Sequence, residues 1–131
     1  MKPVITLQGY KIIKLLRERI EKTDKLDKEE KPFNMKVAYK LVENNQLAFL
    51  KLETKLYINE AKYEVILEGA FNVEDSSLTE EQIKQFVKVN GTAILYPYIR
   101  SNISVISALD SQDSVLMPTL NTNIFRENDT I

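Results

Sequence analysis

The stretch ILYPYIRSNISVISAL, residues 94–109, decides the fold of this chain. Its β-branched residues favour a strand, but Pro97 cannot donate a hydrogen bond to a sheet ladder. In a helix, Pro97 would lie within about the first turn or add a modest kink. A helix also gathers the apolar residues into one stripe, Leu95, Ile99, Ile103 and Ile106, with Tyr98, Asn102, Val105 and Leu109 beside it. The sequence therefore predicts a helix, provided that the upstream segments need one to cover them.

Upstream, apolar and polar residues alternate with the period of two that a β-strand requires, over residues 33–42, 47–58 and 63–73. Turns rich in Asn and charged residues, at 43–46 and 59–62, separate these stretches. Three successive strands with short connections predict an antiparallel meander with one apolar face. Gly69 interrupts the apolar row of the third strand, which indicates a bulge or a close approach of another element.

The N-terminal region has a mixed pattern. Residues 4–16 fit both helical and strand periods, and Gly9 argues against one continuous helix. We expect a strand that begins near Tyr10. Residues 17–31 hold twelve charged residues of both signs, which is typical of a solvated connection between strands.

A short helix is expected after the meander. Ser77 or Thr79 can cap its start, and Asn90 with Gly91 predicts its end. Residues 110–131 have the Pro, Asn and Asp content of a loop, with a few apolar anchors.

The composition argues against some classes of function. The 131 residues, 44% hydrophobic and 28% charged, fit one domain over residues 1–131. A net charge of −1 gives no long-range attraction to nucleic acid, and no apolar run reaches the ~20 residues of a membrane span. The N-terminus has no secretory signal pattern. We therefore expect a cytoplasmic protein that neither binds nucleic acid nor inserts into a membrane.

The chain contains no Cys and no His. This removes disulfides, thiolate chemistry, the usual zinc ligands and the commonest general base. The sequence predicts a protein that is not an enzyme and that needs no cofactor or metal.

Two blocks of the C-terminal third resemble the SecB family of export chaperones. ILYPYIRSNI (94–103) is similar to the family's Leu-Phe-Pro-Tyr-Ala-Arg-Glu-x-Ile helix segment, and LMPTLNTNIF (116–125) resembles its Leu-Pro-Pro-Val-Asn-Phe region. The blocks stand in the family's order. Tyr96 replaces the usual Phe, Ser101 replaces the common Glu, and the Cys-rich, metal-binding tail of many members is absent. The positions that match one by one are Pro97, Tyr98, Arg100, Ile103, Pro118 and Asn121.

The resemblance implies an α+β subunit, with a four-stranded antiparallel sheet packed against a long C-terminal helix and assembly as a dimer of dimers. It also implies an ATP-independent holdase, which binds unfolded or precursor polypeptides in apolar surface grooves and hands them to the Sec translocase and its motor ATPase. The family also includes SecB-like chaperones that protect an antitoxin of a toxin–antitoxin system, and that function is the alternative.

A holdase needs large, adaptable apolar side chains on its surface. The candidates for client binding are Phe33, Met35, Tyr39, Phe71, Tyr96, Leu116, Met117 and Phe125. For each of them, burial in the core is the ordinary alternative. If the helix serves its own sheet with one side and neighbouring subunits with another, its interface residues are Ile99, Asn102, Ile103 and Ile106.

Two functions of other classes remain open from the residues alone. One is a small-molecule-binding or enzymatic sheet-and-helix domain that uses Tyr and Glu as acid and base. The other is a purely structural assembly protein. Suppression of the aggregation of a denatured protein would distinguish the chaperone from both.

Overall fold

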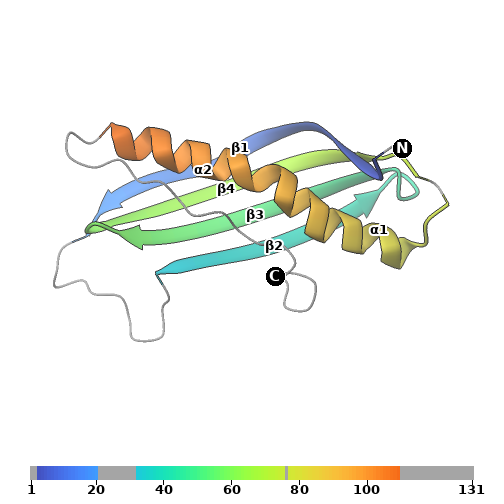
Figure 1. Cartoon of the computed structure of the whole chain (residues 1–131), viewed down its shortest axis with the longest axis horizontal. Coiled ribbons are helices and arrows are strands. Elements are labelled where there is room, and N and C mark those ends of the chain that lie inside the picture. The colour runs from blue at the N-terminus through green and yellow to red at the C-terminus, as the bar shows by residue number, and fades with distance from the viewer. Residues whose placement is uncertain (1–2, 21–31, 76, 110–131) are drawn as a thin grey trace.

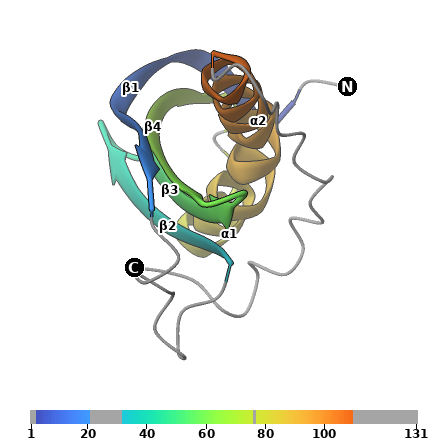
Figure 2. The same cartoon turned by 90° about the vertical axis from the view of Figure 1, so that its left-hand side faces the viewer.

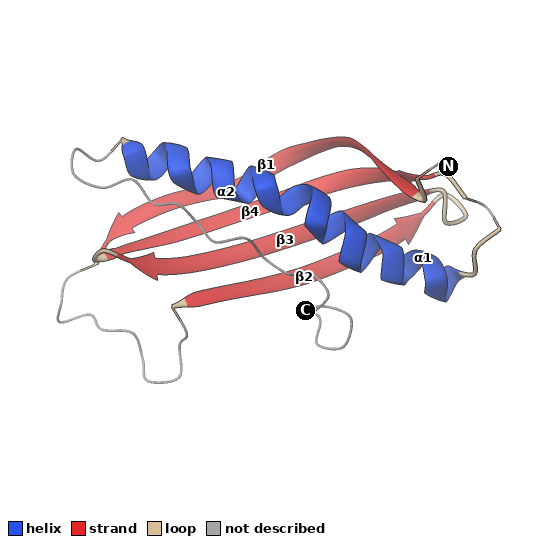
Figure 3. Cartoon of the chain, in the orientation of Figure 1, coloured by secondary structure: helices blue, strands red, loops and turns tan. Residues whose placement is uncertain are grey.

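The protein, seen in a computed structural model, is described over residues 3–20, 32–75 and 77–109. Four antiparallel strands of this part form one sheet in the order β1–β4–β3–β2. A helical layer crosses one face of the sheet diagonally, as Figures 1 and 3 show. The predicted α+β architecture is confirmed, with one long helix against a four-stranded antiparallel sheet. The strands are β1 (Ile5–Arg19), β2 (Phe33–Val42), β3 (Leu47–Ile58) and β4 (Ala61–Val73).

The predicted meander is formed by β2, β3 and β4. Their register runs without a break, so the alternation of apolar and polar residues stays in phase across the three strands. The turn between β3 and β4 is shorter than predicted, because only Asn59 and Glu60 lie between the strands. Both have positive φ angles, 53° and 60°, which is the geometry that closes a two-residue hairpin with the twist of its strands.

Strand β1 is longer than predicted. It begins at Ile5 rather than near Tyr10, and it continues through Arg19, so the start of the charged stretch is strand. Its register against β4 shifts between Leu7 and Gly9 and again between Ile12 and Lys14. Each shift adds one residue and reverses which side chains face the helices, so no single alternation runs through the strand. Residues 21–31 of the charged stretch lie outside the described part.

The helical layer consists of α1 (Glu80–Phe86), a π-helical turn η1 (Val87–Gly91) and α2 (Thr92–Ala108), which follow one another directly. Thr79 caps α1 in a capping box with Gln82. The predicted helix end at Asn90 and Gly91 is wrong: Gly91 has right-handed helical angles, φ −61° and ψ −42°, and the chain continues into α2.

Close packing explains why a glycine sits in the middle of this layer. A Cβ atom on Gly91 would lie 2.9 Å from Leu50 Cδ2 of β3. The packing around Gly69 of β4 is similarly close, because a Cβ atom on Gly69 would lie 3.0 Å from both methyl carbons of Leu95. The register of β3 with β4 is unbroken at Gly69, so the close approach is confirmed and the bulge is not. The two glycines let the helices lie directly on the centre of the sheet.

The core lies between the helices and the face of the sheet that they cover, which is called the inner face below. Figure 2 shows the sheet curving around the helical layer, with the helices in its concavity. Leu50, Leu52, Leu67, Leu95, Ile99 and Ile103 are completely buried there. On the opposite, outer face, Lys14 of β1 is bonded to Glu64 of β4, its Nζ atom lying 3.0 and 3.1 Å from the two carboxylate oxygens.

The environment of Glu64 shifts the pKa of its carboxyl group. Burial is the largest single influence and raises the pKa, but the hydrogen bond and charge of Lys14, with the charges of Lys55 and Lys62, outweigh it. The pKa is therefore below its ordinary value of 4.5. A carboxyl group whose pKa is lowered by folding stabilises the fold above its unfolded pKa, and that contribution is lost as the pH falls through its folded pKa.

We expect Gly69→Val to lower the free energy of unfolding by about 1–3 kcal/mol, because the added atoms collide with Leu95 and Phe71 in a closed core. The matched control is Ala70→Val, the next residue of the same strand, on the outer face; it should change stability by less than about 0.5 kcal/mol. Urea unfolding followed by circular dichroism measures both. If both variants lost the same free energy of unfolding, the contact with Leu95 would not be what limits the size of the side chain at position 69.

We expect Glu64→Gln to remove part of the acid sensitivity of the fold. The stability difference between the wild type and Glu64→Gln should shrink as the pH falls below about 4.5, because the wild-type carboxylate becomes protonated. Since Lys14 is about half exposed, the difference at neutral pH should stay within about 1 kcal/mol. Urea unfolding measures this stability difference at pH values between 7 and 3, spaced about one pH unit apart. A difference that does not vary with pH would contradict the assignment.

Candidate functional site

Phe33, Met35 and Tyr39, three of the predicted client-binding residues, lie together on the inner face of β2. With Leu41 they form what we call the β2 surface. All four side chains are half-buried and pack against the edge of the core, whereas Val37 between them is buried completely. The Nζ atom of Lys88 lies 5.3 Å from the centroid of the Tyr39 ring. β2 is an edge strand, so a row of apolar side chains stands beside backbone groups that have no neighbouring strand among the described residues.

Two other candidates are core residues, which corrects the prediction for them. Phe71 is 0% exposed and Tyr96 is 4% exposed, so neither can contact a client in this conformation. Burial raises the pKa of the Tyr96 hydroxyl, against a smaller opposing effect of the Arg100 charge. Both residues lie where the helical layer meets the sheet centre, and their aromatic type alone could not distinguish that place from a surface. The remaining candidates, Leu116, Met117 and Phe125, lie outside the described residues.

A second apolar surface, on β1 and α2, was missed by the sequence reasoning. We call it the β1–α2 surface. The rings of Tyr10 and Tyr98 join its two halves, with centroids 4.6 Å apart. Ile12 is 51% exposed and Val105 is 62% exposed, which is unusual for large aliphatic side chains. Its residues are Tyr10, Ile12, Leu15, Tyr98, Val105 and Leu109.

The bulge of β1 between Ile12 and Lys14 explains the strand half of this surface. Tyr10, Ile12 and Leu15 stand opposite Gly69, Leu67 and Val65, which are inner-face residues of β4, so all three face the same side despite their uneven spacing. On α2, residues 98, 102, 105 and 109 recur at helical intervals along one side. The helical spacing of residues 98, 102, 105 and 109 can be seen in the sequence. The strand residues cannot be grouped from the sequence, because a period of two places Leu15 on the opposite face from Tyr10 and Ile12.

The predicted interface residues of α2 divide into two groups. Ile99 and Ile103 are 0% exposed, because the chain's own sheet covers them, so subunit contact is not needed to explain their burial. Asn102 and Ile106 are partly exposed. Asn102 donates a hydrogen bond from its side-chain nitrogen to the Tyr98 carbonyl at 2.7 Å. A partner molecule could therefore reach α2 along the side that carries Asn102 and Val105.

No group of three or more acidic residues that could hold a metal ion occurs in the described part of the chain. Neither of its α-helices is long and apolar enough to cross a membrane. What the described residues offer is apolar surface beside two sheet edges. Such surfaces bind polypeptide through side-chain contacts and backbone hydrogen bonds.

Comparison with known proteins finds no matching family model. An uncharacterized protein of Methanocaldococcus jannaschii is 36% identical over 53 residues, which are 40% of this chain. The match spans 33% of that protein's length, about a third.

Solved structures are similar over most of the chain. A SecB-like chaperone of Mycobacterium tuberculosis, in complex with a ChAD peptide from the HigA1 antitoxin, matches with a TM-score of 0.67 and 15% identity, over 88% of this chain and 90% of that one. A protein of unknown function from Streptococcus agalactiae matches with a TM-score of 0.65 and 9% identity, over 88% and 97% of the two chains. The resemblance noticed in the two sequence blocks is thereby confirmed at the level of architecture: this chain has a SecB-like fold.

Proposed function

We propose that this protein is an ATP-independent chaperone that holds unstructured polypeptide, and that its client is an antitoxin of a toxin–antitoxin system. The observation that carries the proposal is the partly buried apolar row on the inner face of an edge strand, the β2 surface. It offers an extended client both side-chain contacts and a strand edge that no other described strand covers. Phe33, Tyr39 and Met35 provide large contact area, and the thioether chain of Met35 adapts to different clients.

The choice of client rests on the comparison. The sequence resemblance first suggests export, with transfer of precursors to the translocase. The solved SecB-like chaperone is bound to an antitoxin peptide, and this supports the antitoxin function better than the export function.

We also propose that the β1–α2 surface binds a second copy of the chain. β1 is a long edge strand of 15 residues, and the exposed aromatic and aliphatic side chains beside it form a larger apolar area than scattered surface residues would. Two copies related by a two-fold axis can pair β1 with β1 in antiparallel fashion and pack the exposed sides of α2 together. A dimer of dimers would follow if the α2 side that carries Asn102 and Ile106 contacts a further pair.

The change Phe33→Ser with Met35→Ser should weaken client holding. We expect the concentration needed to suppress aggregation of a denatured model protein to rise at least about fivefold, because two apolar contacts are lost. The control is Lys36→Ser with Val42→Ser, on the same strand but the opposite face, which should leave the concentration unchanged. Light scattering measures both, after circular dichroism shows that each variant is folded. A folded wild type that fails to suppress aggregation at stoichiometric concentration would refute the chaperone function.

Client identity is tested by purifying the protein from its native cell and identifying the bound chains by mass spectrometry. We expect an antitoxin to dominate in the wild type and to be lost in the Phe33→Ser, Met35→Ser variant. Recovery of many precursors with export signals, and of no antitoxin, would restore export as the function.

The change Val105→Lys should shift the protein to a smaller assembly. At a two-fold contact, the new lysine of one copy would be buried against the same lysine of the other copy, and the like charges would repel each other. Ile58→Lys is the matched control, an exposed aliphatic residue at the end of β3, which is an inner strand of the sheet, and it should leave the mass unchanged. Light scattering after gel filtration at micromolar concentration gives the mass. A wild type that is monomeric at every concentration would exclude this interface.

A further inference from the structure

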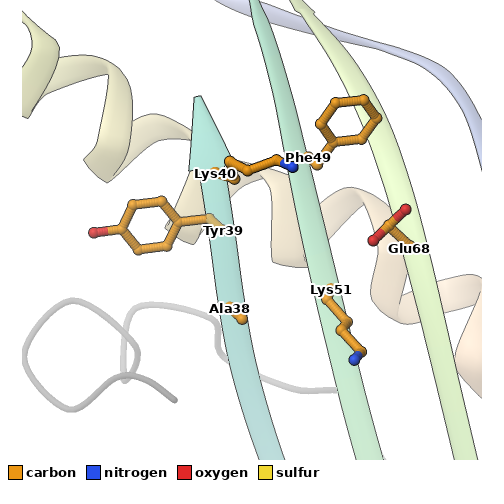
Figure 4. A pocket seen from close by; sticks show the side chains of 6 residues that line it. All are labelled: Ala38, Tyr39, Lys40, Phe49, Lys51 and Glu68. Carbon is orange, nitrogen blue, oxygen red and sulfur yellow. The ribbon is translucent and has the colours of Figure 1, made fainter. Parts of the chain in front are cut away.

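The outer face of the sheet carries a shallow trough that the proposed function does not use. Two open hollows, of ≈ 270 Å³ and ≈ 260 Å³, share Phe49 and Glu68 in their linings. The first extends over Ala38 and Lys40 of β2, and the second reaches β1. The two hollows adjoin at these side chains, and their lining residues together come from all four strands; we call the pair of hollows the trough. Figure 4 shows the β2 half, with Lys40, Phe49 and Glu68 on three adjacent strands.

The register explains why this part of the face is hollow. One row across the sheet reads Lys40, Phe49, Ala70 and Gly9, from β2 to β1. Ala70 and Gly9 have almost no side chain, and a Cβ atom on Gly9 would meet nothing within 4 Å. The half-buried ring of Phe49 therefore stands beside open space rather than under a neighbour. The Nζ atom of Lys40 lies over this ring, 5.6 Å from its centroid.

The rim of the trough is basic. The neighbouring row reads Ala38, Lys51, Glu68 and Lys11 from β2 to β1, so Glu68 is the one acidic side chain among the lining residues of both hollows. The positive charge also prevails over the outer face of the described strands. Seven lysines (Lys11, Lys14, Lys36, Lys40, Lys51, Lys55 and Lys62) stand there against four glutamates (Glu18, Glu53, Glu64 and Glu68).

We propose that this trough is a second docking site, and that it binds an acidic segment of a partner polypeptide. Carboxylates of the segment would pair with Lys40, Lys51 and Lys11, and an apolar side chain between them would enter the hollow beside Phe49. The charge of the rim selects an acidic partner, and the apolar floor selects a polypeptide with side chains to bury. Nucleic acid fits less well, because Glu68 stands in the middle of the trough and the whole chain has a net charge of −1.

The site lies on the face of the sheet opposite to the β2 surface and the helices. A client held on the inner face and an acidic partner held on the outer face would therefore contact different side chains, except at Tyr39. Tyr39 belongs to the β2 surface and also lines the first hollow, so the two sites share that residue. Lys40, Lys51, Lys11 and Phe49 lie outside the β2 surface, so variants at these positions test the trough without changing the proposed client surface.

The test uses fluorescence anisotropy with the full chain and a short labelled peptide of alternating Asp or Glu and Leu or Phe, at about 150 mM salt so that distant charges are screened. We expect this peptide to bind at least about tenfold more tightly than the same peptide with Lys at every acidic position. Lys40→Glu with Lys51→Glu should weaken binding about tenfold. Phe49→Ala should weaken it about fivefold, through the lost apolar contact.

The matched control is Lys36→Glu with Lys55→Glu, which makes the same charge change on the same two strands and the same face but outside the trough. It should weaken binding less than about threefold. Lys11→Glu, at the β1 end, provides an independent variant if the Lys40 and Lys51 pair fails to fold. Suppression of aggregation should be unchanged in all these variants.

Three results would overturn the proposal. Equal losses in the trough variant and its control would mean that diffuse charge alone binds the peptide. Equal binding of the acidic and basic peptides would remove charge selection. Competition by a single-stranded oligonucleotide as effective as that by the unlabelled acidic peptide would assign the surface to nucleic acid instead.

Discussion

The contact on which this structure depends is the direct seating of the helical layer on β3 and β4. Leu95 lies on Gly69 and Gly91 lies on Leu50, at distances that leave no room for a further carbon atom. The approach buries Leu95, Ile99 and Ile103 completely, and each such side chain contributes about 1.5–3 kcal/mol to stability. A π-helical turn between α1 and α2 keeps the layer continuous across this point.

Because the helices occupy the centre of the inner face, apolar side chains toward the two edge strands are only partly covered. On one edge this leaves the β2 surface, and on the other it leaves the β1–α2 surface. Both edges lack a neighbouring strand in the described part of the chain. A monomeric domain would ordinarily protect such edges with charges or cover them. Here the charged side chains of the strands lie mainly on the outer face, so the two inner-face edges keep apolar side chains.

The bulges of β1 connect the architecture to the β1–α2 surface. Without the extra residue between Ile12 and Lys14, Leu15 could not face the helix side together with Tyr10 and Ile12, because residues 12 and 15 differ by an odd number. The bulges also bend the strand over α2, where Tyr10 contacts Tyr98. The same strand supplies Lys11 and Gly9 to the outer trough, so one irregular strand shapes both faces.

The sequence by itself determined the meander and the helix, because strict alternation over residues 33–73 and an apolar stripe at helical spacing are local properties of the chain. It also brought Phe33, Met35 and Tyr39 to one face, since they share the parity of one strand. Only the tertiary structure decided which aromatic residues are core, because burial of Phe71 and Tyr96 depends on where the helix lies. Likewise, Gly91 continues the helix instead of ending it because Leu50 lies against it, and Tyr10 reaches the surface with Tyr98 because the bulges reset the register. These outcomes depend on contacts between distant segments, which a local pattern does not contain.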